Sequence, residues 1–261
     1  MSHLIEEVRK QQPLIHNITN QVVMNFTANG LYAVGAAPVM AHAKEEVEEM
    51  ARIASAVVLN IGTLTKEQVD AMILAGKSAN QAGVPVVLDP VGVGATTFRT
   101  DSANRILQEV KVTCIRGNAG EIANLAGVDA QVRGVEGSSD IDVQKLAKLA
   151  FETLQIPLAI TGEKDVVVDQ GAQVSISNGH PLLTKVTGAG CLLSAVIAAF
   201  ISVSDHVTEA MSDAISYYNV AAEKAAEKHA YPGSFQVAFL DQLFEVDGAA
   251  ISKKKRINRS L

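Results

Sequence analysis

The sequence predicts an α/β protein of three layers, in which a mostly parallel sheet lies between two layers of helices. Apolar runs of strand length alternate with amphipathic runs of helix length along most of the chain. The composition agrees, since 48% of the residues are hydrophobic but only 4% are aromatic, and small apolar residues suit helices packed closely on a parallel sheet. The 261 residues contain no internal repeat and no linker-like segment. We therefore expect one domain over residues 1–250, followed by a basic tail over residues 251–261.

In the first half of the chain, apolar runs that end in polar residues or glycine predict strands. They are Leu14–Asn20, Ala36–Met40, Ala56–Gly62 and Val84–Pro90. Helical spacing and end signals predict the helices Gln21–Val34, Lys44–Ala54 and Thr65–Ala82. We expect Asn20 and Thr65 to cap two of these helices, and Gly35 and Gly83 to end them.

The same alternation continues in the second half. Helices are expected over Thr100–Val110, Asp142–Leu154, Val207–Ala230 and Ser234–Val246, and a long apolar helix follows Cys191. Strands are expected over Val112–Ile115 and Pro157–Gly162, and a hairpin joins Val166–Val168 to Val174–Ile176. Arg116–Glu121 is predicted as a polar loop before a short helix that ends at Leu125, and Val128–Ser139 as a surface loop. Lys253–Arg259 is a run of charge that we expect to be a solvated end.

Charge and hydropathy exclude several classes of protein. The net charge of −6 argues against general nucleic-acid binding, and no apolar run approaches the roughly 18 residues of a membrane span. The charged start over Met1–Lys10 does not resemble a secretion signal. Cys114 and Cys191 form no short-spaced metal or redox motif. These features predict a reduced, cytoplasmic protein.

Two glycines before the long apolar helix predict an anion site. Gly188-Ala189-Gly190 turns the chain tightly and leaves backbone N–H groups uncovered, while the helix that follows adds its positive dipole end. Three other polar groups follow predicted strands: Asp89, the Arg116–Glu121 loop and Thr161. Because ligands of such sheets bind at the carboxyl ends of the strands, we expect all four groups on one rim.

Each of these residues suits phosphoryl transfer, in which catalysis is mostly positioning and charge neutralisation. Asp89 and Glu121 could hold Mg²⁺, or could be a turn carboxylate and a helix-start charge. Arg116 could clamp phosphate oxygens or pair on the surface. Asn118 could hold a metal-bound water or cap a helix, and Thr161 could donate to a phosphate or close a turn.

The two cysteines have different predicted roles. Cys191 is expected on the first turn of the apolar helix, where a thiol ionises more easily and could accept a proton from a substrate hydroxyl. It could equally be a small core residue. Cys114, in the middle of an apolar strand, is expected to be core.

These motifs together resemble the ribokinase-like superfamily of small-molecule kinases. The glycine loop and the Asn118–Glu121 box carry that resemblance, and in most of the superfamily the loop ends in Asp where this chain has Cys191. With that departure, the chain from about Ile5 to Val246 is similar to the hydroxyethylthiazole kinase family. The further matching segments are Pro13–Asn20, Met24-Asn25, Ala28–Gly30 and Pro38–Ala41.

The resemblance implies ATP-dependent phosphorylation of 4-methyl-5-(2-hydroxyethyl)thiazole, a step toward thiamine. It also implies Mg²⁺ and a homotrimer with the thiazole pocket near a subunit interface. By position, Met40, Gly188 and Asn20 are assigned to the thiazole, Arg116 and Thr161 to ATP, and Glu121 and Asp89 to the metal. Gly188, Ala189, Gly190 and Cys191 form the anion hole, and Cys191 occupies the position of the catalytic base.

Three alternatives are distinguishable. A related kinase for a hydroxymethylpyrimidine is disfavoured by Cys191 and the His16–Asn20 segment. A hydrolase with Cys191 as nucleophile needs a histidine base, and none of the six histidines lies in a motif that would supply one. The third alternative is a thiazole-binding sensor without catalysis. Replacement of Glu121 separates it from a kinase, because binding should survive and turnover should not.

Overall fold

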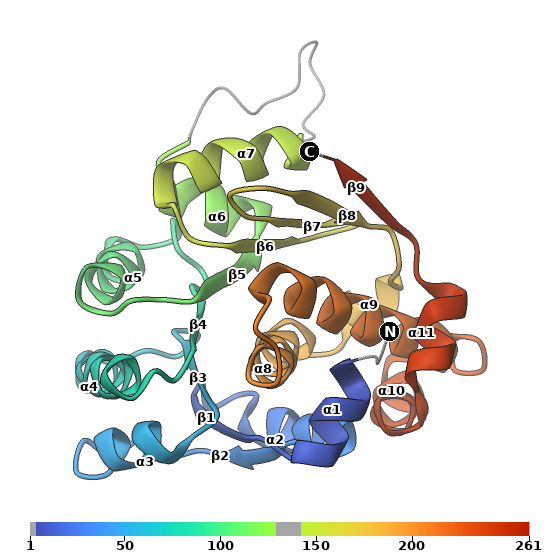
Figure 1. Cartoon of the computed structure of the whole chain (residues 1–261), viewed down its shortest axis with the longest axis horizontal. Coiled ribbons are helices and arrows are strands. Elements are labelled where there is room, and N and C mark those ends of the chain that lie inside the picture. Colours follow the sequence, from blue (N-terminus) through green and yellow to red (C-terminus); the bar gives the residue numbers. More distant parts are fainter. Residues whose placement is uncertain (1–3, 129–141, 261) are drawn as a thin grey trace.

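The computed structural model describes residues 4–128 and 142–260, and its centre is one nine-stranded sheet. The strands are β1 (Leu14–Ile18), β2 (Ala37–Val39), β3 (Ala56–Asn60), β4 (Val86–Asp89), β5 (Cys114–Asn118), β6 (Leu158–Thr161), β7 (Asp165–Val168), β8 (Gln173–Ile176) and β9 (Ile257–Ser260). Their order is β2-β1-β3-β4-β5-β6-β7-β8-β9. The pairs from β2 to β6 are parallel, and β7, β8 and β9 add antiparallel (Figure 1). The predicted fold class, including the hairpin, is confirmed.

Helices cover both faces of the sheet, as Figure 1 shows. One layer contains α3 (Val47–Ile53), α4 (Lys66–Ala82), α5 (Thr97–Glu109), α6 (Ala119–Leu125) and α7 (Val143–Leu154). The other contains α1 (Leu4–Gln11), α2 (Met24–Val34), α8 (Ala189–Ile201), α9 (Val207–Ala226), α10 (Pro232–Glu245) and α11 (Gly248–Lys254), with the short 3₁₀ helix η1 (Pro181–Lys185) before α8. Each layer has its own apolar core against one face of the sheet. The most deeply buried helix is α8, of which all thirteen residues except Gly190 and Cys191 are buried.

Several predicted helix ends are confirmed. The Thr65 side chain accepts a hydrogen bond from the Gln68 N–H, and Gly35 and Gly83 end α2 and α4 in the left-handed conformation that glycine favours. The start predicted for α2 is wrong, because the helix begins at Met24 and Asn20 does not cap it. The helix expected from Lys44 also begins later, at Val47.

The predicted polar loop at Arg116–Glu121 is also wrong. Arg116, Gly117 and Asn118 are the last residues of β5 and pair with β6, and α6 begins directly at Ala119. Main-chain hydrogen bonds to the neighbouring strand do not depend on apolar side chains, so the strand continues through polar residues. The loop expected over Val128–Ser139 lies, apart from Val128, outside the described residues.

The basic end of the chain does not behave as a solvated tail. Residues 248–254 form α11, and β9 pairs antiparallel with β8 at the edge of the sheet. The backbone of an edge strand pairs whatever the charge of its outward side chains, and lysine is common at such edges. No helix in the described part of the chain is long and apolar enough to cross a membrane.

Candidate active site

Polar side chains from five neighbouring strands meet at one rim of the parallel sheet. Asn60 at the end of β3 lies opposite Asp89 at the end of β4, and Asn118 at the end of β5 lies opposite Thr161 at the end of β6. Asn20 follows β1, and the start of α8 faces the same rim. The structure therefore brings together the groups expected there from sequence.

A chain of hydrogen bonds connects the Cys191 thiol to the Asp89 carboxylate. Asn20 Nδ2 lies 3.4 Å from Cys191 Sγ and 2.9 Å from Asn60 Oδ1. Asn60 Nδ2 then donates to Asp89 Oδ2 at 2.8 Å. Asn60 is completely buried and its Oδ1 also accepts from the Gly62 N–H at 3.0 Å, so its amide is fixed at both ends.

Asp89 is a buried carboxylate with one oxygen satisfied and one free. Its Oδ2 accepts from Asn60 and, at 2.7 Å, from Ser194 Oγ of α8, whereas its buried Oδ1 has no hydrogen-bond partner among the described residues. Burial raises the pKa of Asp89 to about 6, although the Arg116 charge acts in the opposite direction. An unpartnered carboxylate oxygen of this kind is suited to a cation or a donor from a ligand.

Arg116 lies over the first turn of α8. Its Nη2 donates to Thr161 Oγ1 at 2.6 Å, and its Nη1 lies 3.8 Å from Asp89 Oδ2. A Cβ atom at Gly190 would come within 2.8 Å of Nη1, so only a glycine lets the guanidinium approach this closely. The arginine thus adds a fixed positive charge to the positive end of a helix, which is an arrangement that binds phosphate.

Glu121 is held at the start of α6 by a capping box. Its Oε2 accepts from the Asn118 N–H at 2.8 Å, Asn118 Oδ1 accepts from the Glu121 N–H at 2.9 Å, and its Oε1 accepts from the Gly92 N–H at 2.8 Å. The helix-cap alternative for Asn118 is therefore confirmed. The Glu121 charge also contributes to raising the pKa of Asp89, so the two carboxylates are close enough to interact electrostatically.

Cys191 is on the first turn of α8 as predicted, but the predicted ease of ionisation is wrong. Burial, together with the Asp89 charge, raises the pKa of its thiol to about 11. The positive end of α8 would lower the pKa of the thiol, but the enclosure of the sulfur and the nearby Asp89 carboxylate raise this pKa by more. Within the described ranges, the hydrogen bonds of Cys191 involve asparagines and no histidine. Cys114 is buried core as expected, and burial raises the pKa of its thiol.

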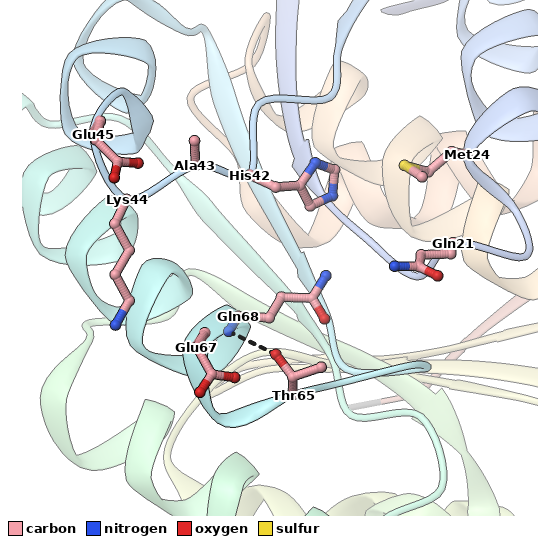
Figure 2. A pocket seen from close by; sticks show the side chains of 9 residues that line it. All are labelled: Gln21, Met24, His42, Ala43, Lys44, Glu45, Thr65, Glu67 and Gln68. Carbon is pink, nitrogen blue, oxygen red and sulfur yellow. Dashed lines mark hydrogen bonds between the residues drawn. The ribbon is translucent and has the colours of Figure 1, made fainter.

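Two cavities open near this rim. One is lined by Ala189 and Gly190, next to Cys191, and the other is lined by Gln21, next to the Asn20 that contacts the thiol. The larger, about 760 Å³, reaches from Arg116, Thr161 and Gly190 to Tyr218 and Asn219 on α9, and we call it the nucleotide-side cavity. The smaller, about 560 Å³, lies between the start of α2, the segment after β2 and the start of α4, and we call it the thiol-side cavity. Figure 2 shows its lining side chains, among them His42, Met24 and Gln68.

Met40, a predicted substrate residue, follows β2 beside the thiol-side cavity. Its carbonyl oxygen lies 3.1 Å from Nδ1 of His42, whose Nε2 lies 3.2 Å from both the N and the O of Thr19. The imidazole thus joins the segment after β2 to the segment after β1 that carries Asn20. The two predicted substrate segments are adjacent through this contact.

Comparisons with known proteins match this arrangement to one family. The sequence profile of the hydroxyethylthiazole kinase family matches residues 5–248. A protein named hydroxyethylthiazole kinase from Halalkalibacterium halodurans is 55% identical over 259 residues, which is 98% of this chain and 99% of that protein. This chain belongs to the hydroxyethylthiazole kinase family.

Solved structures agree with that membership. The structure of a hydroxyethylthiazole kinase protein from Pyrococcus horikoshii OT3 superposes with a TM-score of 0.91 at 42% identity, covering 99% of this chain and 98% of that chain. A ribokinase-like superfamily protein from Enterococcus faecalis has a TM-score of 0.64 at 11% identity and covers 89% and 86%, which shows a shared fold alone. The likeness to ribokinase-like kinases predicted from the glycine loop is thus confirmed.

In this member of the hydroxyethylthiazole kinase family, sequence reasoning missed Asn60 and Ser194, the two donors to Asp89. Asn60 could have been found, because it is a polar residue at the end of an apolar strand, as Asp89 is. Ser194 carries no such signal, since it lies inside an apolar helix and is recognised only once α8 is placed over β4. Asp165 was missed as well, because the hairpin was predicted to begin at Val166.

Proposed function

We propose that this chain transfers the γ-phosphoryl group of ATP to the hydroxyl of 4-methyl-5-(2-hydroxyethyl)thiazole, a salvage step toward thiamine. The observation that carries the proposal is the Arg116 guanidinium fixed over Gly190, at the start of the helix that also presents Cys191. A phosphoryl group held there would lie between a cavity large enough for a nucleotide and the Cys191 thiol.

The nucleotide side would hold the triphosphate. Arg116 offers paired N–H donors, Thr161 its hydroxyl, and the first turn of α8 its backbone N–H groups, of which that of Ala189 also donates to the Val186 carbonyl at 3.3 Å. We assign Gly188, Ala189, Gly190 and Cys191 to the anion hole that receives the transferred group.

The thiol side would hold the thiazole alcohol, with Met40, Gly188 and Asn20 as its contacts. Gly188 has a φ of +87° and packs closely on Val23, which directly precedes Met24 of the thiol-side cavity. The polar groups next to the thiol are the neutral amides of Asn20 and Asn60. A neutral alcohol can hydrogen-bond to these amides next to the thiol, while the charged residues of the thiol-side cavity are Lys44, Glu45 and Glu67.

Mg²⁺ fits Asp89 and Glu121. Magnesium takes one or two protein carboxylates and completes its shell with water and substrate phosphates. Asp89 offers a buried oxygen without a partner in the described part of the chain. Glu121 lies close enough to raise the pKa of Asp89, and its two oxygens accept backbone N–H groups while keeping lone pairs for a cation. Among the described residues there is no cluster of three or more acidic, histidine or cysteine side chains that would form an all-protein site. When bound, the ion would neutralise charge on the phosphates.

The chain's own residues then act by orientation. The hydroxyl oxygen of the alcohol attacks the γ-phosphorus, the bond to the β-phosphate oxygen breaks, and ADP leaves. In a loose transition state the hydroxyl proton is lost late, so a weak acceptor suffices. With its raised pKa, Cys191 is a neutral thiol at pH 7. We therefore infer that it orients the hydroxyl rather than acting as a strong base.

Assembly and location remain part of the proposal. Family resemblance supports a homotrimer in which a neighbouring subunit closes the thiol-side cavity. Two free thiols and an acidic net charge support work in the reducing cytoplasm, on small molecules rather than on nucleic acid or membranes.

The deciding experiment measures ADP release from ATP with each alcohol separately. We expect turnover with the thiazole alcohol and at least tenfold less with a hydroxymethylpyrimidine; the reverse would assign the chain to the pyrimidine kinases. Inactivation by iodoacetamide that ATP does not prevent, with hydrolysis of an ester, would instead favour a cysteine hydrolase. Thiazole binding without ADP release would leave a sensor.

A further inference from the structure

We propose that the C-terminal segment, residues 254–260, positions the wall of the nucleotide-side cavity, and that Asn178 is the positioning residue through which it acts. This extends the proposed function only by taking that cavity as the ATP site. The segment contains part of the charge run expected to be solvated, yet it forms the end of α11 and the edge strand β9.

Asn178 connects the segment to the cavity. The residue is buried, and both polar atoms of its side-chain amide form hydrogen bonds with the backbone of the segment. Oδ1 accepts from the Arg256 N–H at 2.6 Å, and Nδ2 donates to the Lys254 carbonyl at 3.0 Å. The same Nδ2 lies 3.2 and 3.3 Å from the two carboxylate oxygens of Glu223 on α9. Removal of this side chain would leave two backbone groups of the segment without these partners.

Arg256 makes a second connection at the same place. Its Nη2 donates to the Ser177 carbonyl at 2.9 Å and to Glu223 Oε1 at 2.5 Å, and the Ser177 N–H donates to the Arg256 carbonyl at 3.0 Å. Glu223 also accepts from the Gly179 N–H at 2.9 Å. Residues 177–179, which line the cavity, are thus held between the segment and α9.

From Asn178 the hydrogen bonds continue inward along the cavity wall. The Asn178 carbonyl accepts from Asn219 Nδ2 at 2.9 Å, and the same Nδ2 donates to Asp165 Oδ2 at 2.6 Å. Asp165 Oδ1 accepts from the Gly162 N–H at 3.0 Å, next to Thr161, the partner of Arg116. All of these residues line the cavity, so the segment is connected to the group that clamps phosphate.

This connectivity predicts an effect on one substrate only. The hydrogen bonds of the segment run to the nucleotide side, whereas Asn20 and Cys191 belong to a second chain of hydrogen bonds, which meets the first where Arg116 lies 3.8 Å from Asp89. Loss of the connection should therefore weaken ATP and ADP binding and leave the binding of the alcohol unchanged. A segment that only stabilised the fold would lower the melting temperature without this selectivity.

The test compares three variants in the full chain. Arg256→Ala removes the exposed side chain but keeps its backbone bond to Asn178, Asn178→Ala removes the positioning residue, and Lys255→Ala is the control, because it removes the same charge one residue away. The measurements are the KM for ATP, the KM for the thiazole alcohol, the Kd of ADP by calorimetry, and the thermal melting of each protein.

We expect the KM for ATP and the Kd of ADP to rise about threefold in Arg256→Ala and about tenfold or more in Asn178→Ala, with the KM of the alcohol within about twofold. Lys255→Ala should match the wild type. The inference is overturned if Arg256→Ala binds ADP as the wild type does, or if both substrates weaken equally. A wild-type chain that binds no adenine nucleotide would overturn the proposed function itself, which is a different result.

Discussion

The nucleotide side and the thiol side of the site are built on adjacent ends of the same parallel strands, yet they differ in charge. The nucleotide side has the Arg116 guanidinium near the carboxylates of Asp89 and Glu121, whereas the hydrogen-bond partners of the Cys191 thiol are asparagine amides. The charged residues of the thiol-side cavity are Lys44, Glu45 and Glu67. Phosphoryl transfer needs fixed charge where the phosphates lie, whereas a neutral alcohol needs only orientation. The comparison suggests that substitutions on the nucleotide side should cost much more turnover than those on the thiol side.

Glu121→Gln should have the largest effect, a fall in kcat of about a hundredfold or more with little change in the KM of the alcohol. Glutamine also serves at the third position of a capping box, so α6 should persist while the negative charge is lost. Steady-state kinetics with both substrates varied measures this. Glu163→Gln is the matched control, because it removes the same charge from an exposed residue of the nucleotide-side cavity. A Glu121→Gln rate within threefold of the control would contradict a metal role.

A second prediction concerns stability on the nucleotide side. Burial raises the pKa of Asp165 to about 6 from its ordinary 3.8. The folded state therefore holds this proton more tightly than the unfolded state, so the stabilisation is complete below pH 3.8 and is lost as the pH rises past 6. A shift of about two pKa units corresponds to about 3 kcal/mol. The free energy of unfolding of Asp165→Asn minus that of the wild type should therefore increase by about 3 kcal/mol between about pH 3.5 and pH 7, because only the wild type loses this stabilisation.

Denaturant unfolding at several pH values measures that difference, and Asp169→Asn is the control of opposite sign. Burial acts to raise the pKa of Asp169, but hydrogen bonds from Thr208, Gly171 and Ala172 lower it on balance. Asp169 therefore contributes stability above its ordinary pKa that is lost as the pH falls, and its replacement should cost stability near pH 7. If the free energies of unfolding of the two variants, relative to the wild type, changed with pH in the same direction, burial would not raise the pKa of Asp165.

The two glycines of the anion loop separate binding from folding. At Gly190 a methyl group would meet the flexible end of Arg116, so Gly190→Ala should displace the guanidinium and raise the KM for ATP about tenfold with nearly unchanged melting. At Gly188 the φ of +87° opposes any side chain, and so does Val23, whose Cγ1 would lie 2.7 Å from an added Cβ. Gly188→Ala should therefore lower the melting temperature. Equal effects of the two substitutions on ATP binding would contradict the separate roles.

The sequence predicts the features that follow from the alternation of apolar and amphipathic runs, or from chemistry local to one element. Alternating runs predict the layers and the sheet, and the rule that ligands bind at strand ends places Asp89, Arg116 and Thr161 on one rim. Thr65 and Gly83 mark helix ends by local chemistry, which needs no knowledge of the fold. The strand that continues through Arg116 and Asn118 was missed, because a neighbouring strand rather than side-chain polarity sustains it.

The remaining features depend on contacts between residues far apart in sequence. Ser194 acquires its role only when α8 lies across β4, 105 residues away from Asp89. The direction of the Cys191 pKa shift depends on enclosure and on Asp89, which together outweigh the local helix end. β9 exists because β8 offers a free edge. Each of these effects depends on residues that are close only in the folded structure, so no local sequence pattern indicates it.

Cys191 should show the smallest effect on turnover and gives the sharpest test of the thiol side. Its thiol pKa of about 11 leaves little thiolate at pH 7, so a strong base is absent from the wild type. Cys191→Ser should retain turnover within about tenfold, and Cys191→Asp should equal or exceed the wild type, because Asn20 and Asn60 can donate to a carboxylate there. Alkylation by iodoacetamide near pH 7 should be correspondingly slow.

Measured kcat values for the two variants, with Kd values for ADP and the alcohol, decide between orientation and base catalysis. If every substitution at Cys191 abolished turnover while both ligands still bound, the thiol would be an essential base, and the thiol side would match the nucleotide side in importance. If Cys191→Asp were active and its kcat gained a new acidic limb below the pKa of the introduced carboxylate, the neutral side would have acquired a base that the wild type does without. That result would show that phosphoryl transfer tolerates a charged residue at position 191. The neutral thiol would then reflect the neutral alcohol that binds beside it, rather than a requirement of the reaction.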